Sequence, residues 1–82
     1  MANFLFYHGV VCSKLNMYPN ARYSFQLACR FGHIPATREL GILYVQGKGG
    51  DVDINEGSRL LHMAENAGDE TASLALDMFL EF

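Results

Sequence analysis

The chain has 82 residues, of which 50% are hydrophobic and 18% are charged. This composition is that of one folded domain and excludes a disordered chain. Six basic and nine acidic residues give a net charge of −3, and the basic residues are scattered singly. The sequence therefore has no basic stripe, and we expect no nucleic-acid partner. Because a chain of this length buries a modest core, a protein partner or a homo-oligomer is an expected source of added stability.

Hydrophobic residues crowd the amino-terminal segment, where we predict a helix at about residues 2–14. The apolar run from Phe4 to Cys12 is too short to span a bilayer. It also lacks the preceding basic residue and the following cleavage site of a signal peptide. We therefore expect a buried first helix in a soluble, cytoplasmic protein without a membrane partner. Cys12 and Cys29 are too few for a disulfide framework and are expected to be free thiols.

A second helix is predicted at about residues 19–31. Pro19 suits its first turn, where the missing amide hydrogen costs nothing, and Asn16 is a candidate cap. The stretch before this helix, residues 9–18, has no glycine-rich loop. Residues 1–32 are therefore expected to form a divergent first hairpin.

The next hairpin has clearer signals. Leu40, Leu43 and Tyr44 have helical spacing and predict a helix at about residues 35–46. The run Gly47-Lys-Gly-Gly follows it, and its glycines permit the positive φ values of a tight loop.

A fourth helix is predicted at about residues 54–67 and a fifth at about 70–81. Asp53 can cap the free amides of the fourth helix, and Glu56 can reach back to complete a capping box. Gly68 is expected to end this helix in the left-handed conformation.

An internal repeat with an offset of 36 residues relates these segments. Small residues fall on small ones, and large apolar residues fall on large apolar ones. The matched pairs are Ala21 with Gly57, Phe25 with Leu61, Leu27 with Met63, Ala28 with Ala64, Gly32 with Gly68, Ala36 with Ala72 and Leu40 with Leu76. A period of this size is typical of helical-hairpin solenoids.

The central hairpin resembles the Sel-one-like repeat, a relative of the tetratricopeptide repeat. The residues that carry the resemblance are Leu40, Gly41, Tyr44, Gly47, Gly49, Asp53, Ala64 and Gly68. The resemblance implies an all-α fold of about five helices, a short right-handed α/α superhelix (solenoid) in a single domain, residues 1–82. Residues 33–69 would be the clear repeat, and residues 70–82 a C-terminal capping helix, because Asp77 replaces the small glycine of the family. Gly57 and Glu65 also depart from the family pattern, which has alanine at both positions.

The resemblance also implies a partner-binding surface, because solenoids of this type bind a peptide along the concave face of their first helices. Its outward positions form a mostly apolar surface with one cation at its edge. These residues are Arg38, Ile42, Val45, Gln46, Leu74 and Met78, flanked by Pro35 and Thr71. Arg38 would bind a carboxylate, and the apolar side chains would supply contact area. For Ile42 and Leu74, an ordinary place in the core is an equal alternative.

The sequence predicts no catalytic residues, no metal site and no cofactor. His8, His33 and His62 are far apart, and there is no Cys-x-x-Cys pair. The glycine run follows a predicted helix rather than a strand, unlike a phosphate loop. Some cysteine-rich members of the family have been associated with β-lactamase activity, but the Ser-x-x-Lys motif is absent. We therefore expect a non-enzymatic adaptor or scaffold, with a specific inhibitor such as a toxin-neutralising immunity protein, or a regulatory subunit, as alternatives.

Overall fold

The computed structural model describes residues 1–80, and within this range the chain forms five α-helices and no strand. The helices are α1 (Ala2–Lys14), α2 (Tyr18–Arg30), α3 (Ile34–Gln46), α4 (Ile54–Asn66) and α5 (Glu70–Phe79). The all-α class and the five expected helices are thus confirmed. The expected end of the last helix, residue 81, lies outside the described residues.

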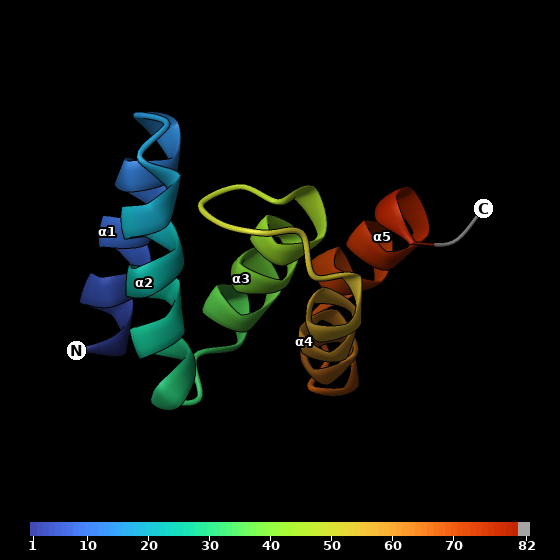
Figure 1. The fold of residues 1–82 in the computed structure, drawn as a ribbon. Coiled ribbons are helices and arrows are strands. Elements are labelled where there is room, and N and C mark those ends of the chain that lie inside the picture. The colour runs from blue at the N-terminus through green and yellow to red at the C-terminus, as the bar shows by residue number, and fades with distance from the viewer. Residues whose placement is uncertain (81–82) are drawn as a thin grey trace.

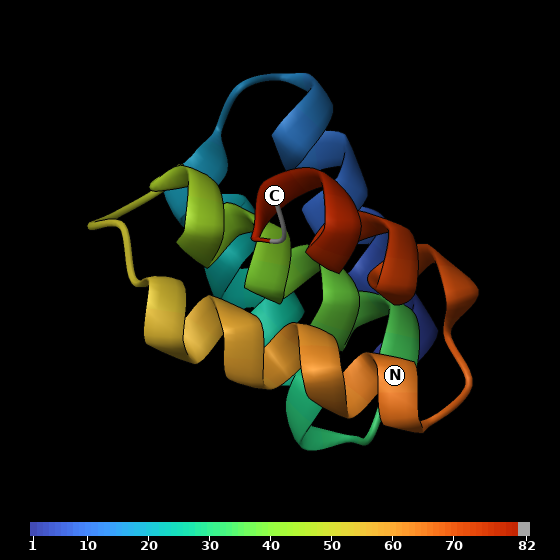
Figure 2. The same ribbon diagram turned by 90° about the vertical axis from the view of Figure 1, so that its right-hand side faces the viewer.

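Consecutive helices pack against one another, from α1 at one end of the molecule to α5 at the other (Figure 1). The helices α1 and α2 run antiparallel, and α3 lies between them and the last two helices. The view turned by 90°, with the α5 end toward the viewer, shows α5 close to both α4 and α3 (Figure 2), and both contacts are present. The helix α3 therefore contacts α2 on one side and α4 and α5 on the other.

The core alternates large side chains with alanines. One cluster joins α1, α2, α3 and α4, and a second joins α4 and α5. Phe25 in the first cluster and Leu61 in the second are the largest fully buried side chains. Around them lie Ala28 and Ala64, which are also fully buried. Small residues at these positions let the helix backbones approach closely, so a large side chain of one helix fills the space left by its neighbour.

The 36-residue repeat of the sequence is also present in the structure. The helices α2 and α4 begin and end 36 residues apart, and α3 and α5 begin 36 residues apart. Phe25 and Leu61, which the offset relates, are equivalent in burial. His33 and Asp69 are the N-caps of α3 and α5, and the side chain of each accepts a hydrogen bond from the backbone amide three residues later. Equivalent positions therefore have equivalent structural roles.

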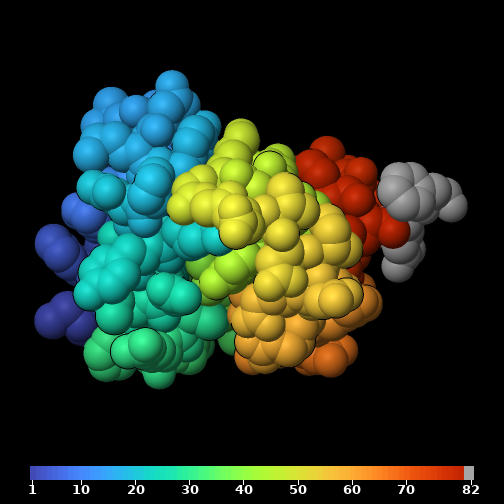
Figure 3. Space-filling view, in the orientation of Figure 1, coloured from blue at the N-terminus to red at the C-terminus, as the bar shows by residue number. Residues whose placement is uncertain are grey.

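The glycine-rich loop after α3 is fixed by contacts with α2. Gly47 ends α3 with a φ of 70°, a left-handed conformation that favours glycine. The Arg22 guanidinium lies 4.3 Å from the centroid of the Tyr44 ring and donates to the carbonyl oxygens of Leu43 and Lys48. In the space-filling view this loop rests directly on the beginning of α2 (Figure 3).

Two cap predictions need correction. Asn16 does not cap α2, because its side-chain oxygen accepts a hydrogen bond from the Tyr18 hydroxyl instead, at 2.9 Å. Asp53 does cap α4, since its Oδ1 accepts from the amide of Glu56 at 3.0 Å. The Glu56 carboxylate, however, binds Arg59 rather than reaching back to complete a capping box.

The expectation that the first helix is buried also needs correction. One face of α1 packs on α2, where Gly9 and Cys12 are buried. The opposite face exposes large apolar side chains, among them Phe4 at 70% of its surface and Leu15 at 64%. The apolar run in the sequence did not distinguish these two faces, because α1 is apolar on almost every side. Among residues 1–80, no helix has both the length and the apolar character needed to cross a membrane.

Candidate functional site

A shallow groove of about 240 Å³ lies between the end of α1 and the outer face of α3. We call it the α1–α3 groove. Its lining residues are Ser13, Lys14, Tyr18, Glu39, Ile42, Leu43, Gln46 and Lys48. The lining therefore combines apolar side chains with charged and amide groups. Such a lining suits a peptide that carries both apolar and polar side chains.

The structure brings two of the expected partner-binding residues, Ile42 and Gln46, into this groove. Ile42 also packs against the core cluster of α4 and α5, so it contributes both to the core and to the surface. Leu74 and Met78 lie on α5 and are exposed over 59% and 73% of their surface. They are not part of the α1–α3 groove, but they remain available for contact.

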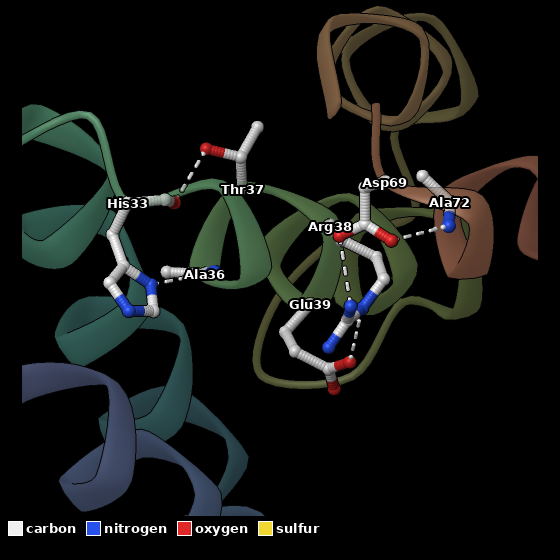
Figure 4. Close-up of polar contacts among 7 residues, drawn as sticks. All are labelled: His33, Ala36, Thr37, Arg38, Glu39, Asp69 and Ala72. Atoms are coloured by element: carbon white, nitrogen blue, oxygen red, sulfur yellow. Dashed lines mark hydrogen bonds and ion pairs between the residues drawn. The ribbon is translucent and has the colours of Figure 1, made fainter. Parts of the chain in front are cut away.

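Arg38 is engaged within the protein (Figure 4). Its Nη1 donates to Oδ2 of Asp69 at 2.9 Å, and its Nε donates to Oε2 of Glu39 at 3.1 Å. The Arg38 and Asp69 side chains are exposed over only 17% and 9% of their surface. The other oxygen of Asp69 accepts from the amide of Ala72 in the first turn of α5, at 3.1 Å. Arg38 therefore ties α3 to the beginning of α5.

Val45 is also used inside the fold. It packs against the core cluster of α4 and α5 from the α3 side. A Cβ built on Gly57 would lie only 2.5 Å from Val45 Cγ2, and 2.8 Å from the carbonyl oxygen of Gly41. The contact between α3 and α4 is therefore as close as glycine allows, and Val45 fills the space beside it.

Basic residues at the α1–α3 groove were not among the expected site residues. Lys14 stands in the last turn of α1, and Lys48 lies in the loop after α3 with its Nζ 4.9 Å from the centroid of the Tyr18 ring. Two helices and a loop bring these residues together, so no local spacing could have identified them. Glu39 could have been found, because it lies three residues before Ile42 and shares its helix face.

A second groove of about 240 Å³ lies on the side formed by α2 and α4. Its polar wall is an ion pair in which Arg59 binds both carboxylate oxygens of Glu56 at 2.7 Å. The hydrogen bonds from the Arg59 guanidinium lower the pKa of the Glu56 carboxyl below its ordinary value. This groove includes Gln26 and Cys29. We call it the α2–α4 groove.

Two buried hydroxyl groups lie within hydrogen-bond distance of a histidine and a cysteine. The Oγ of Ser24 lies 2.7 Å from Nδ1 of His8, but Ser24 is only 4% exposed, which is too little for attack on a substrate. The Sγ of Cys29 lies 2.9 Å from the Thr37 hydroxyl, which donates its own hydrogen to the carbonyl oxygen of His33.

Both cysteines are free thiols in the structure. In residues 1–80 no three His, Cys, Asp or Glu side chains are grouped so that they could hold a metal ion. No protein-family model, curated protein or solved structure matches the chain. The resemblance of the central hairpin to the Sel-one-like repeat therefore stays a prediction.

Proposed function

We propose that this chain is a non-enzymatic adaptor or scaffold that binds a partner protein through the concave face of a short right-handed α/α solenoid. The observation that carries the proposal is the α1–α3 groove, in which Ile42 and Gln46 lie on the outer face of a first helix. The exposed side chains of Leu74 and Met78 on α5 would extend the binding surface along the next first helix.

The solenoid part of the proposal is supported by repetition along the stack. The 36-residue equivalence of α2 with α4 and of α3 with α5 relates the α2–α3 contact to the α4–α5 contact. The first hairpin follows the same plan with a shorter loop. Gly9 contacts Phe25 in the first hairpin, as Gly41 contacts Leu61 in the second. Stacked equivalent hairpins are the defining feature of a solenoid.

The groove indicates the chemistry of its partner. Ile42 offers apolar contact, while Lys14 and Lys48 offer cations for a carboxylate. An acidic peptide segment with an apolar anchor, extended or helical, fits these groups. Arg38 is not expected to bind it, because both sides of its guanidinium already contact carboxylates of this chain. We propose no cofactor or metal, and a cytoplasmic location.

The other two protein-binding roles use the same surface. A toxin-neutralising immunity protein would form a stoichiometric complex with one target, and a regulatory subunit would be recovered with its enzyme. An adaptor would be recovered with several proteins that share one type of segment. The identity and number of the bound proteins therefore separate these alternatives, since the scaffold alone does not fix the role.

The test compares charge reversals in the two grooves. Affinity purification with cross-linking identifies proteins bound to the parent chain, and their binding is then measured directly. We expect Lys48→Glu, in the α1–α3 groove, to weaken binding at least about tenfold, which corresponds to about 1.4 kcal/mol. Met78→Asp on α5 should have a similar effect, because its side chain is 73% exposed and would lose apolar contact.

Arg30→Glu is the matched control, because Arg30 lines the α2–α4 groove and the charge change is the same. It should leave binding unchanged. Loss of binding in Arg30→Glu with full binding in Lys48→Glu would assign the function to the α2–α4 groove and refute the proposal.

A further inference from the structure

The outer face of α1 carries an uncovered apolar stripe. Phe4, Tyr7, Val11 and Leu15 recur every three or four residues and are exposed over 70%, 64%, 54% and 64% of their surface. Met1 extends the row and is 81% exposed. We call these five residues the α1 stripe. In Figure 1, α1 lies at the outer edge of the molecule, with α2 beside it.

The α1 stripe lies on the face of α1 opposite its packed face. Gly9 marks the packed face, because a Cβ there would lie 2.6 Å from Phe25 of α2. A helix that is apolar on all sides is normally buried on all sides. Contact with α2 therefore accounts for the packed face of α1 and leaves the α1 stripe without a packing role.

Comparison of α1 with α3 shows what the stripe is shaped to contact. The two helices have the same length and are related by an offset of 32 residues, which places Gly9 on Gly41. The same offset places Phe4 on Ala36 and Val11 on Leu43, both of which are buried in the core that α3 shares with α2. Two positions of the α1 stripe therefore correspond to positions of α3 that a neighbouring helix covers, whereas Tyr7 falls on the partly exposed Glu39.

We propose that the α1 stripe pairs two copies of this chain into a symmetric dimer. Five side chains, each more than half exposed, offer roughly 500 Å² per copy, since the largest of them, the two aromatic ones, carry on the order of 150–250 Å² each. Pairing two stripes would bury roughly 1,000 Å² in total, which is the size of a weak, concentration-dependent interface. A two-fold dimer uses the same patch twice, so one apolar stripe is sufficient.

The charges of α1 favour a second copy over a charged partner surface. The helix contains no Asp or Glu, and Lys14 in its last turn is its one Lys or Arg. An antiparallel pairing keeps the two Lys14 side chains at opposite ends of the interface. It also places the positive end of each helix dipole beside the negative end of the other. A parallel pairing would bring both lysines together.

The spacing of the stripe also suits the antiparallel arrangement. Phe4 of one copy would lie opposite Leu15 of the second copy, and Tyr7 opposite Val11. Each aromatic ring then meets a smaller aliphatic side chain, which is the alternation of large and small residues that fills a helix interface. The α1–α3 groove stays open in this dimer, because its α1 residues, Ser13 and Lys14, lie outside the stripe.

Sedimentation velocity over a range of concentrations tests the dimer with the complete chain. The parent should associate, and Phe4→Glu and Leu15→Arg should each raise the dimer dissociation constant at least tenfold while the helical circular dichroism is unchanged. Tyr23→Glu is the matched control, because Tyr23 on α2 is 64% exposed, like Tyr7, but lies outside the stripe. It should leave association intact.

The double variant Phe4→Glu with Leu15→Arg tests the antiparallel register. Antiparallel pairing places the introduced acid opposite the introduced base at both ends, so the double variant should dimerise more tightly than either single variant. A monomeric parent at every concentration would refute the proposal, as would association that is insensitive to both single changes. Binding of the parent to phosphatidylcholine–phosphatidylglycerol vesicles in place of self-association would assign the stripe to a membrane surface and also refute it. These outcomes are independent of partner binding in the α1–α3 groove.

Discussion

The ion pair between Arg38 and Asp69 offers the sharpest test of how the candidate surface is built. Arg38→Met removes the charge and keeps a long apolar side chain. Asp69 would then retain its hydrogen bond from the first turn of α5 but lose the guanidinium that neutralises it. Because only 9% of the Asp69 side chain is exposed, water can replace the lost contact only in part.

The expected cost lies between two limits. An exposed ion pair contributes about 0–1 kcal/mol, whereas removing one partner of a fully buried pair costs about 3–5 kcal/mol. Arg38 is 17% exposed and Asp69 is 9% exposed, so we expect a loss of about 2 kcal/mol in the free energy of unfolding. For a small domain with a slope near 1 kcal/mol per molar urea, the midpoint should fall by about 2 M.

Urea unfolding followed by circular dichroism measures this loss, and hydrogen exchange should show faster opening of α5 in the variant. Arg59→Met is the matched control, because Arg59 also binds a carboxylate but is 57% exposed. It should cost clearly less than Arg38→Met, because water screens an exposed ion pair. Equal costs for the two variants would refute the structural role. If Arg38→Met lost partner binding at unchanged stability, Arg38 would instead belong to the partner-binding surface.

Three further predictions concern packing, titration and thiol reactivity. Gly57→Ala should lower the free energy of unfolding by about 1–2 kcal/mol, because the added Cβ would crowd the carbonyl oxygen of Gly41. This cost should exceed the gain from the higher helix propensity of alanine. A variant as stable as the parent in urea unfolding would contradict the prediction. Above pH 4.5, the lowered pKa of Glu56 should make the parent more stable than Glu56→Gln by less than about 1 kcal/mol. This difference in stability should disappear as the pH falls through the lowered pKa. Unfolding measured at several pH values tests it. Cys29 should react with a thiol reagent faster than the buried Cys12 in the native protein, and both should react in denaturant, as mass spectrometry of the labelled chain can show.

Local and repeating signals made most of the fold predictable. Helix ends follow from residues with a direct role in the backbone, such as Asp53 at the start of α4 and Gly47 at the end of α3. The 36-residue offset identified Phe25 and Leu61 as equivalent before either was known to be the largest buried side chain of its cluster. The first kind of signal depends on neighbouring residues and the second on repetition, and both can be recognised from the sequence alone.

The candidate surface was less predictable, because its residues depend on contacts between distant segments. Transfer of outward positions placed Arg38 on the surface, but it could not show that Asp69, 31 residues away, would occupy the guanidinium. Val45 likewise turns toward α4 because Gly57 leaves space there. Lys14 and Lys48 line the groove because α1 and α3 both pack against α2. Helical periodicity shows which residues share one face of a helix, whereas these contacts depend on how the helices pack against one another.

The two proposed surfaces would act together if the chain dimerises through α1. The stripe points away from the helix stack, whereas Lys14 and Ile42 face the α1–α3 groove, so each dimer would present two open grooves. A partner with two suitable segments, or a partner that is itself dimeric, would bind such a dimer with an avidity about 10²–10⁴ times the affinity of one groove, provided that its spacing matches. Phe4→Glu would then weaken binding of a bivalent partner without changing the affinity for a single peptide. The ratio of these two affinities, measured in parent and variant, separates a groove defect from a dimer defect.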